Sequence, residues 1–320
     1  MSFLNTGVVI LLAPSYELAV PLPASISIEA EYGTQVKEGR LYTAAHHQPI
    51  GVRDGEWTDI EEGGHAVAPI VDVQIPNIKE GIILVSHLDL DTVGGCLRAM
   101  GADLDWYMDG DFAAAAAEMD VRGPHRMPEI LERMVRDHHL LPARAKKYKK
   151  QFHAWWALSR RVRYARDEVH DVTSHVVEAA HLLRRINRMD PDVIDAGEDW
   201  AEAREAARAA SFVSASTFKS GHTVLLRKRI EGEFVNAQYE HEGGVADIII
   251  GYKPEGGEIT ISTSRPVPEL DCREFMQEVY GPEAGGKNGI AGSPREASLG
   301  LADATELLER LQEHLWRPQT

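Results

Sequence analysis

The chain has 320 residues, which is enough for two domains, and its content of 43% hydrophobic and 26% charged residues is ordinary for a globular protein. Its net charge of −16 argues against binding to duplex nucleic acid, because the phosphate backbone requires a basic protein surface. The two cysteines, Cys96 and Cys272, offer neither a disulfide framework nor a zinc-ligand spacing, so we expect a protein of the reducing cytoplasm.

Residues 1–78 are rich in β-branched residues, glycine and proline, and we expect them to form a β-rich N-terminal section. Strands are expected at Val8–Leu12, at the alternating segment Ile26–Glu31 and at Tyr42–Ala44. The apolar run Val8–Ala13 is far shorter than the roughly 20 residues of a membrane span. It also lacks a basic flank, so we expect neither a signal peptide nor a membrane partner.

The most informative segment comes next, where a strand runs into a cluster of polar residues. Ile82–Ser86 has the apolar, β-branched composition of a buried strand, and a helix is expected at Cys96–Met100 after Gly94 and Gly95. The polar residues between them stand at alternate positions, and they are His87, Asp89 and Asp91. In an extended segment this alternation would direct all three side chains to one side.

This set of side chains predicts a divalent metal site. Carboxylate oxygens suit Mg²⁺ and Mn²⁺, and an imidazole shifts the preference towards Mn²⁺, Fe²⁺ or Zn²⁺. Ligands in open α/β sheets bind at the edge where strands lead into helices, which is where this cluster would lie. The structural alternative is a polar loop in which an aspartate caps the following helix.

Helical patterns dominate the next part of the chain. Helices are expected at Asp111–Met119, Pro128–Arg136, Ala143–Arg166, Asp167–Arg188 and Glu198–Ala210. The last of these could link two domains. Asp171 and His175 would share a face of one helix, either as ligands or as an ordinary surface pair.

Two polar clusters flank the helix expected at 128–136. Asp120 is followed by Arg122, His125 and Arg126, and arginine side chains recognise phosphate through two parallel hydrogen bonds. The alternative is a turn at the helix end beside Gly-Pro. The tripeptide Asp137-His138-His139 follows the same helix, and a helix C-terminus alone would also favour histidine there.

After Ser211 the pattern changes to strands, which predicts a second domain of α+β type over residues 211–320. Strands are expected at Thr223–Leu226, Phe234–Tyr239, Ala246–Tyr252 and Glu258–Ser262, and helices at Glu269–Val279 and Leu301–Leu315.

A glycine-rich segment within this domain is expected to bind an anionic substrate. Its glycines permit positive φ and a close approach of the backbone, so that amide groups can form an anion-binding nest. Lys287 would add a point charge and Arg295 a planar fork for phosphate. The expected substrate-binding residues are Gly285, Gly286, Lys287, Gly289, Gly292, Ser293 and Arg295. The alternative is a flexible surface turn.

Taken together, these segments resemble the DHH phosphoesterase superfamily. The strand followed by clustered His and Asp is similar to the first motif of that superfamily, and Gly285–Arg295 is similar to the GGHxxAAG-type loop of its DHHA1 domain. Asp137-His138-His139 is the tripeptide that names the family, although here it follows an expected helix rather than a strand. Lys287 stands where the family usually has histidine. The resemblance covers residues 80–320.

The resemblance implies an α/β fold with three parts. Residues 79–210 would form a DHH-type catalytic domain with a parallel sheet and helices, and residues 211–320 a smaller α+β DHHA1-like substrate-binding domain. Residues 1–78 would precede them. Two divalent ions, Mn²⁺ most probable and Mg²⁺ the alternative, would be held by His87, Asp89, Asp91, Asp120, His138 and Asp171, with His125 as a rival of His138. His138, His139 and Arg126 would support catalysis.

The implied activity is a metal-dependent phosphoesterase. Metal-activated water would hydrolyse a phosphodiester or phosphomonoester of a small nucleotide or a short single-stranded oligonucleotide. Two alternatives stay open, a metal-dependent amidohydrolase or aminoacyl-editing hydrolase, and a catalytically degenerate nucleotide-binding protein. The sequence also leaves a homodimer open.

Overall fold

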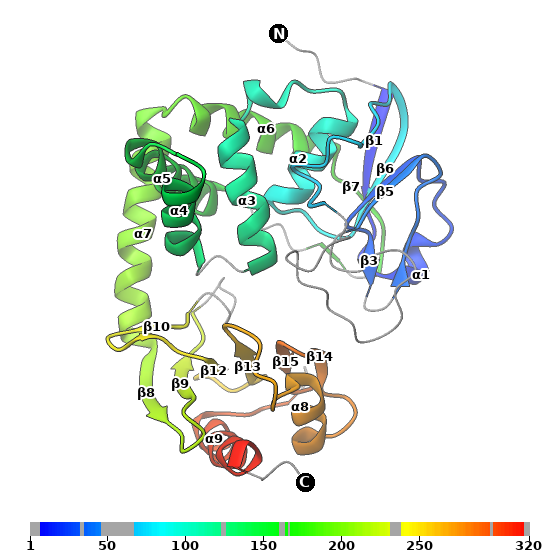
Figure 1. Ribbon diagram of the computed structural model, residues 1–320. Coiled ribbons are helices and arrows are strands. Elements are labelled where there is room, and N and C mark those ends of the chain that lie inside the picture. The colour runs from blue at the N-terminus through cyan, green and yellow to red at the C-terminus, as the bar shows by residue number, and fades with distance from the viewer. Residues whose placement is uncertain are drawn as a thin grey trace. The chain divides into compact units, whose positions relative to one another are not determined.

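The computed structural model describes residues 7–32, 35–45, 67–122, 126–159, 164–165, 167–230, 238–294 and 297–316 (Figure 1). The chain divides into two compact units. The first comprises Met1–Arg122 and Arg126–Ala201, and the second comprises Gly123–His125 and Glu202–Thr320.

A five-stranded sheet forms the centre of the first unit, with strand order β5-β2-β6-β1-β7. The strands are β1 (Gly7–Leu12), β2 (Ile26–Ile28), β5 (Tyr42–Ala44), β6 (Glu80–Val85) and β7 (His170–Asp171). The first four are parallel, and β7 pairs antiparallel with β1. Val85 of β6 is in register with Leu12 of β1 and with Ile28 of β2. The carboxyl ends of three strands therefore meet at one edge.

This sheet corrects the expectation of a separate N-terminal section over residues 1–78. Strands β1, β2 and β5 pair with β6 or with each other, so they belong to the same sheet as the polar cluster. A short hairpin of β3 (Glu31–Tyr32) and β4 (Gln35–Val36) follows β2. The boundary expected at residue 78 is absent because these segments bury their apolar side chains, such as Ile10 and Ile26, by joining the central sheet.

Helices cover one face of the sheet. The first unit contains α1 (Tyr16–Ala19), α2 (Leu90–Ala99), the 3-10 helix η2 (Leu104–Trp106), α3 (Gly110–Arg122), α4 (Met127–Asp137), α5 (Pro142–Leu158) and α6 (Thr173–Asn187). Helices α2 and α6 contact the strands, and α3, α4 and α5 pack around them (Figure 1). Helix α5 ends earlier than expected, and β7 occupies residues that were expected to be helical.

The core lies between the sheet and α2. Ile10, Ile26 and Ile83 are fully buried, and each such side chain contributes about 1.5–3 kcal/mol. Gly95 of α2 allows the helix to approach the sheet closely, because a Cβ there would lie 3.0 Å from the Ile28 side chain of β2. A Cβ on Gly94 would lie 2.4 Å from the Ile70 side chain, in the segment before β6. These glycines serve helix packing, and the helix already begins at Leu90 rather than near Cys96.

The second unit contains a six-stranded sheet of order β14-β15-β13-β12-β9-β8. Its strands are β8 (Phe212–Thr217), β9 (Thr223–Lys228), β12 (Ile248–Tyr252), β13 (Thr260–Thr263), β14 (Gly285–Lys287) and β15 (Ile290–Gly292). Only β9 and β12 are parallel to each other among these described strands. A small ribbon of β10 (Glu240–His241) and β11 (Gly244–Val245) lies outside this sheet.

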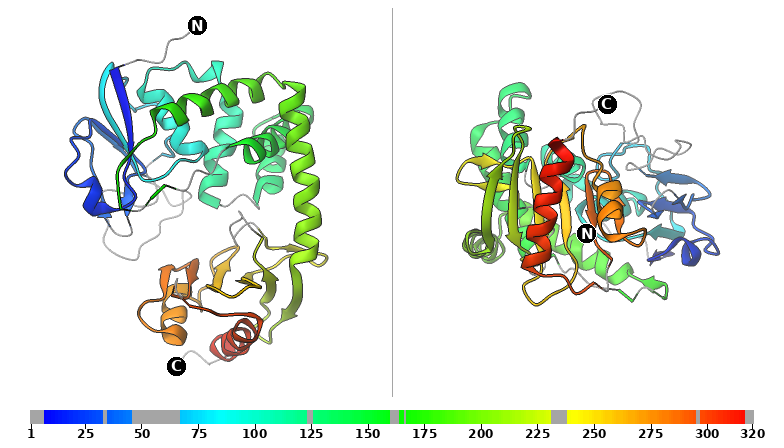
Figure 2. Two further views of the ribbon diagram at one scale, coloured as in Figure 1. Left: turned by 180° about the vertical axis from the view of Figure 1, so that it is seen from behind. Right: turned by 90° about the horizontal axis from the view of Figure 1, so that it is seen from below.

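Two helices, α8 (Cys272–Tyr280) and α9 (Leu301–Trp316), pack on this sheet, and α9 crosses β9 and β12 (Figure 2). The second unit is thus of α+β type. The long helix α7 (Pro191–Ser211) contains the boundary between the units, which falls after Ala201 rather than at residue 210. Most of the strand expected at 234–239 lies outside the described residues. Across the described part of the chain, no helix is both long enough and apolar enough to cross a membrane.

Candidate metal centre

The centre begins where β2 and β6 end. Glu29 directly follows β2, and Ser86 and His87 directly follow β6. Because the two strands are parallel neighbours in register, these residues leave the sheet at the same edge. Glu29 is fully buried and its φ is 48°, a left-handed conformation that is uncommon outside glycine and concentrates at functional sites.

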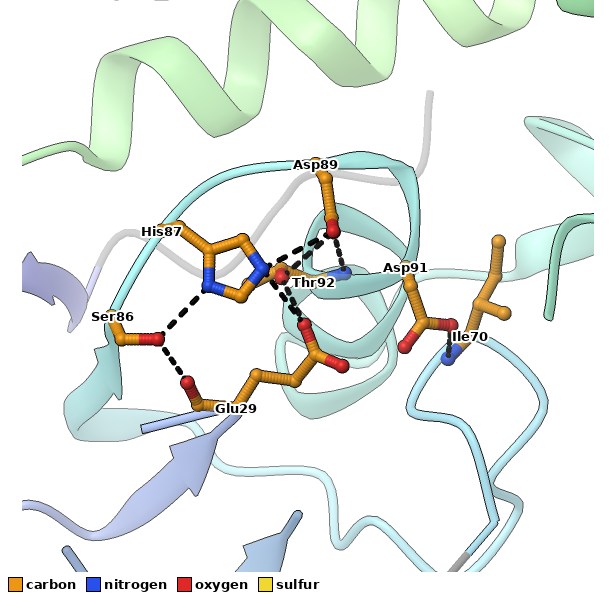
Figure 3. A network of polar contacts seen from close by, with 7 residues as sticks. All are labelled: Glu29, Ile70, Ser86, His87, Asp89, Asp91 and Thr92. Carbon is orange, nitrogen blue, oxygen red and sulfur yellow. Dashed lines mark hydrogen bonds and ion pairs between the residues drawn. The ribbon is translucent and has the colours of Figure 1, made fainter. Parts of the chain in front are cut away.

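The first group of side chains comprises Glu29, His87 and Asp89 (Figure 3). The His87 Nε2 atom lies 3.2 Å from both Glu29 Oε2 and Asp89 Oδ2. The His87 side chain is 48% exposed. Its partial desolvation would by itself lower the pKa of His87, but the Asp89 and Glu29 carboxylates raise it well above 6.5. At this distance, a proton on Nε2 or a metal ion bound to Nε2 would be attracted by both carboxylates.

Ser86 determines which nitrogen of His87 faces the carboxylates. Its hydroxyl donates to the main-chain oxygen of Glu29 and lies 2.9 Å from His87 Nδ1. Because a hydroxyl has one hydrogen and a carbonyl oxygen can only accept, Nδ1 must donate its own hydrogen to Ser86 Oγ. In the neutral imidazole, Nε2 therefore carries the lone pair that a metal ion would need.

The second group comprises Glu29, Asp91 and Asp120, whose ligand oxygens lie within 4.8 Å of one another. Asp91 is buried in the first turn of α2, where one oxygen accepts a hydrogen bond of 2.9 Å from the Ile70 amide. Asp120 reaches the group from α3 and is half-buried. Glu29 belongs to both groups. Carboxylates held this close in a buried setting repel each other, and bound cations relieve that repulsion.

The alternation expected for His87, Asp89 and Asp91 is corrected by the start of α2. Asp89 is the N-cap of α2 and accepts a hydrogen bond of 2.9 Å from the Thr92 amide. The three residues therefore do not line one side of an extended segment, and they enter two groups that share Glu29. Asp89 fulfils the capping alternative as well as belonging to the first group. Thr92 Oγ1 lies 2.9 Å from both Glu29 Oε2 and Asp89 Oδ1.

The tripeptide Asp137-His138-His139 does not reach this centre. Helix α4 ends at Asp137, His138 caps it, and His139 turns the chain with a φ of 56°. All three side chains are exposed, and Asp137 pairs with Arg136 at 2.8 Å. Neither residue group found among the described residues includes them. The metal role of His138 and the catalytic roles of His138 and His139 therefore stay predictions, since the structure places both side chains at an exposed helix end outside the described groups.

Asp171 is also placed differently from the expectation. It lies in β7 rather than on a helix, it is exposed, and its carboxylate accepts a hydrogen bond of 3.0 Å from the Thr173 amide at the start of α6. It belongs to neither group of described residues and shares no helix face with His175. Arg126 forms an ion pair with Glu129. His125 lies outside the described residues.

The glycine-rich segment forms a hairpin of β14 and β15 rather than an open anion-binding nest. Gly286 has a φ of 147°, and a Cβ there would lie 2.3 Å from the Ile290 carbonyl oxygen. Ser293 is buried, and its hydroxyl accepts a hydrogen bond of 3.0 Å from the Ile259 amide. Its expected contact with substrate stays a prediction. Gly285, Gly289 and Gly292 lie in the same hairpin, while the Lys287 side chain and Arg295 lie outside the description.

Sequence reasoning missed Glu29, Ser86 and Thr92. A weak signal for Glu29 was present, since it is a carboxylate placed directly after the short segment Ile26-Ser27-Ile28, as His87 comes soon after the apolar run Ile82–Val85. The signal was weak because β2 has only three residues.

No family model and no curated protein matches this chain. Similar solved structures include an exopolyphosphatase-related protein from Bacteroides fragilis, with 14% identity, a TM-score of 0.28 and coverage of 44% of this chain and 42% of that one. A pGpG-specific phosphodiesterase from Vibrio cholerae has 10% identity, a TM-score of 0.39 and coverage of 75% and 81%. An uncharacterized protein from Helicobacter pylori has 11% identity, a TM-score of 0.24 and coverage of 74% and 69%.

The chain thus spans less than half the length of the first of these structures. The protein is a mixed α/β protein with a largely parallel sheet, and a cluster of carboxylates and one histidine that could hold metal lies at the carboxyl edge of that sheet.

Proposed function

We propose that this protein is a metal-dependent phosphoesterase that hydrolyses a phosphodiester or phosphomonoester of a small nucleotide or short single-stranded oligonucleotide. The observation that supports this most strongly is the sharing of Glu29 between two groups of ligand atoms. A carboxylate shared in this way suits a pair of divalent ions acting on one phosphoryl group.

The donor set fits such ions. Together the two groups offer one imidazole and four carboxylates, and two divalent cations would balance the four negative charges. Carboxylate oxygens suit Mg²⁺ and Mn²⁺, and the imidazole of His87 favours Mn²⁺ of the two. We propose Mn²⁺, with Mg²⁺ as the alternative.

Bound divalent ions would neutralise phosphoryl oxygens and lower the pKa of water at the centre. The residues of the chain would hold the metal ligands in position for that chemistry. Ser86 holds His87 in one tautomer, the first turn of α2 restrains Asp89 and Asp91, and the left-handed backbone of Glu29 places its carboxylate between the groups.

The test compares Glu29→Gln with Glu80→Gln, which makes the same change at an exposed position at the amino end of β6. Glu29→Gln is expected to weaken Mn²⁺ binding by more than about 100-fold, since even residues that only orient metal ligands cost 10–100-fold. Glu80→Gln should bind Mn²⁺ as the wild type does. Calorimetric titration measures the affinity, and circular dichroism checks that both variants fold.

Activity is measured in parallel with bis(p-nitrophenyl) phosphate, a phosphodiester that has no base, and with an aminoacyl ester. Mn²⁺-dependent cleavage of the phosphodiester alone is expected. Retention of the wild-type Mn²⁺ affinity by Glu29→Gln, or cleavage of the aminoacyl ester alone, would refute the proposal.

A further inference from the structure

A cavity of about 460 Å³ lies beside the metal centre in the first unit. Its lining includes Tyr16, Glu17, Glu31, Tyr32, Gln35 and Ser86. Ser86 connects the two places, because the same residue lines the cavity and contacts both Glu29 and His87. The cavity is broad and open to solvent, so a ligand could enter it directly from the surface.

The cavity is formed by elements at the carboxyl edge of the sheet. Helix α1 follows β1, the β3–β4 hairpin follows β2, and both lie at this end of the sheet in Figures 1 and 2. A molecule bound at the metal centre could therefore extend into the cavity without leaving the first unit. This arrangement suits a substrate with a phosphate at one end and a second recognised group at the other.

The lining is aromatic and acidic. The rings of Tyr16 and Tyr32 lie 6.0 Å apart at an angle of 60°. Tyr32 is held in place because its hydroxyl donates a hydrogen bond of 2.9 Å to the Ala13 carbonyl oxygen. Glu17 contributes an exposed carboxylate, whereas Glu31 contributes one whose Oε1 atom is buried, and no lysine or arginine is among the described lining residues. This chemistry disfavours a phosphate and favours a flat ring that donates hydrogen bonds.

We infer that the cavity binds the base of the nucleotide substrate and prefers guanine; the inference rests on the proposed function of the neighbouring centre. A tyrosine ring offers a stacking surface to any base. The carboxylates provide the selectivity, because they can only accept hydrogen bonds.

The donor pattern of each base decides the preference. Guanine presents its N1–H and 2-amino groups side by side, which matches the two oxygens of one carboxylate. Adenine and cytosine present an amino group next to an acceptor nitrogen. Uracil presents one N–H between two carbonyl oxygens, which a carboxylate would repel. The expected order of affinity is therefore guanine first, adenine and cytosine next, and uracil last.

The experiment measures binding of guanosine, adenosine, cytidine and uridine to the full-length protein by calorimetry, with EDTA present so that metal does not contribute. These nucleosides carry no phosphate that the metal-free carboxylates would repel. Guanosine is expected to bind most tightly. Glu17→Gln and Glu31→Gln are both tested, and removal of the carboxylate that pairs with guanine should reduce the preference for guanosine over uridine roughly 10- to 150-fold. Tyr16→Ala should weaken all four nucleosides roughly 5- to 150-fold.

The control is Glu38→Gln, an exposed carboxylate outside the cavity lining, which should leave all four affinities unchanged. Equal binding, or no binding, of guanosine and uridine by the wild type would overturn the inference, and so would unchanged selectivity in both glutamate variants. These outcomes are independent of the metal centre, because Mn²⁺ binding and the cleavage of the base-free phosphodiester test the proposed function separately.

Discussion

The segments around His87 and His138 both place histidine close to aspartate, and the structure arranges them in opposite ways. His87 and Asp89 follow the parallel strand β6 and meet Glu29 from the neighbouring strand. His138 and Asp137 end helix α4 and point into solvent. Parallel strands deliver the residues after their carboxyl ends to one place, whereas a single helix end delivers only its own residues.

This comparison shows that residue type alone does not make a metal site. At the strand edge, Glu29 and Asp91 are buried beside other carboxylates, which makes a bound cation favourable. At the helix end, Asp137 is exposed and its pKa is lowered mainly by a hydrogen bond from Arg136. Surface pairs of that kind contribute little to stability and need no metal.

The largest effect that would sharpen the comparison is expected from Ser86→Ala. Without the Ser86 hydroxyl, the hydrogen on His87 Nδ1 loses its acceptor. The neutral tautomer with a free lone pair on Nε2 is then no longer favoured over the other tautomer. Mn²⁺ affinity should fall about 10- to 100-fold, the usual cost of losing a group that orients a ligand.

Calorimetry with Mn²⁺ measures the Ser86 effect, and Ser86→Thr should restore most of the affinity because it keeps the hydroxyl. If alanine and threonine bind Mn²⁺ as tightly as serine, the tautomer argument is wrong.

A smaller effect is expected in the pH dependence of stability of the metal-free protein. The folded state raises the pKa of His87 above 6.5, so protonated His87 stabilises the fold fully below pH 6.5. That contribution is lost as the pH rises through the raised value. Urea unfolding in EDTA from about pH 6 to about pH 9 should show the free energy of unfolding fall with pH, and His87→Gln should reduce this slope. An identical slope in the variant would contradict the ion pairing.

Much of the first unit could be predicted from the sequence because its signals are local. The β-branched run at 82–85 and the polar residues after it identified β6 and the centre beside it. Glu29 could not be identified in the same way. Its role depends on the pairing of β2 with β6, and no local pattern in either strand says which strands will be neighbours.

Two other segments contained local signals of the backbone that the structure shows. The chain between β14 and β15 is Asn288-Gly289, a pair common in two-residue hairpin turns, although neither residue has the positive φ that usually explains this preference. The pattern at 128–136 is helical, and the tripeptide Asp137-His138-His139 lies at the end of that helix.

The smallest effect is expected from the double variant that combines His138→Ala with His139→Ala. A large effect in this variant would contradict the comparison. Both side chains are exposed at the end of α4, so removing them should leave Mn²⁺ affinity and phosphodiester cleavage within about twofold of the wild type. Because His139 has a positive φ, His139→Gly is the matched variant that removes the side chain without backbone strain. A loss of Mn²⁺ in the double variant and also in His139→Gly would mean that the tripeptide reaches the centre in solution. The centre would then draw its histidines from the helix end as well as the strand edge.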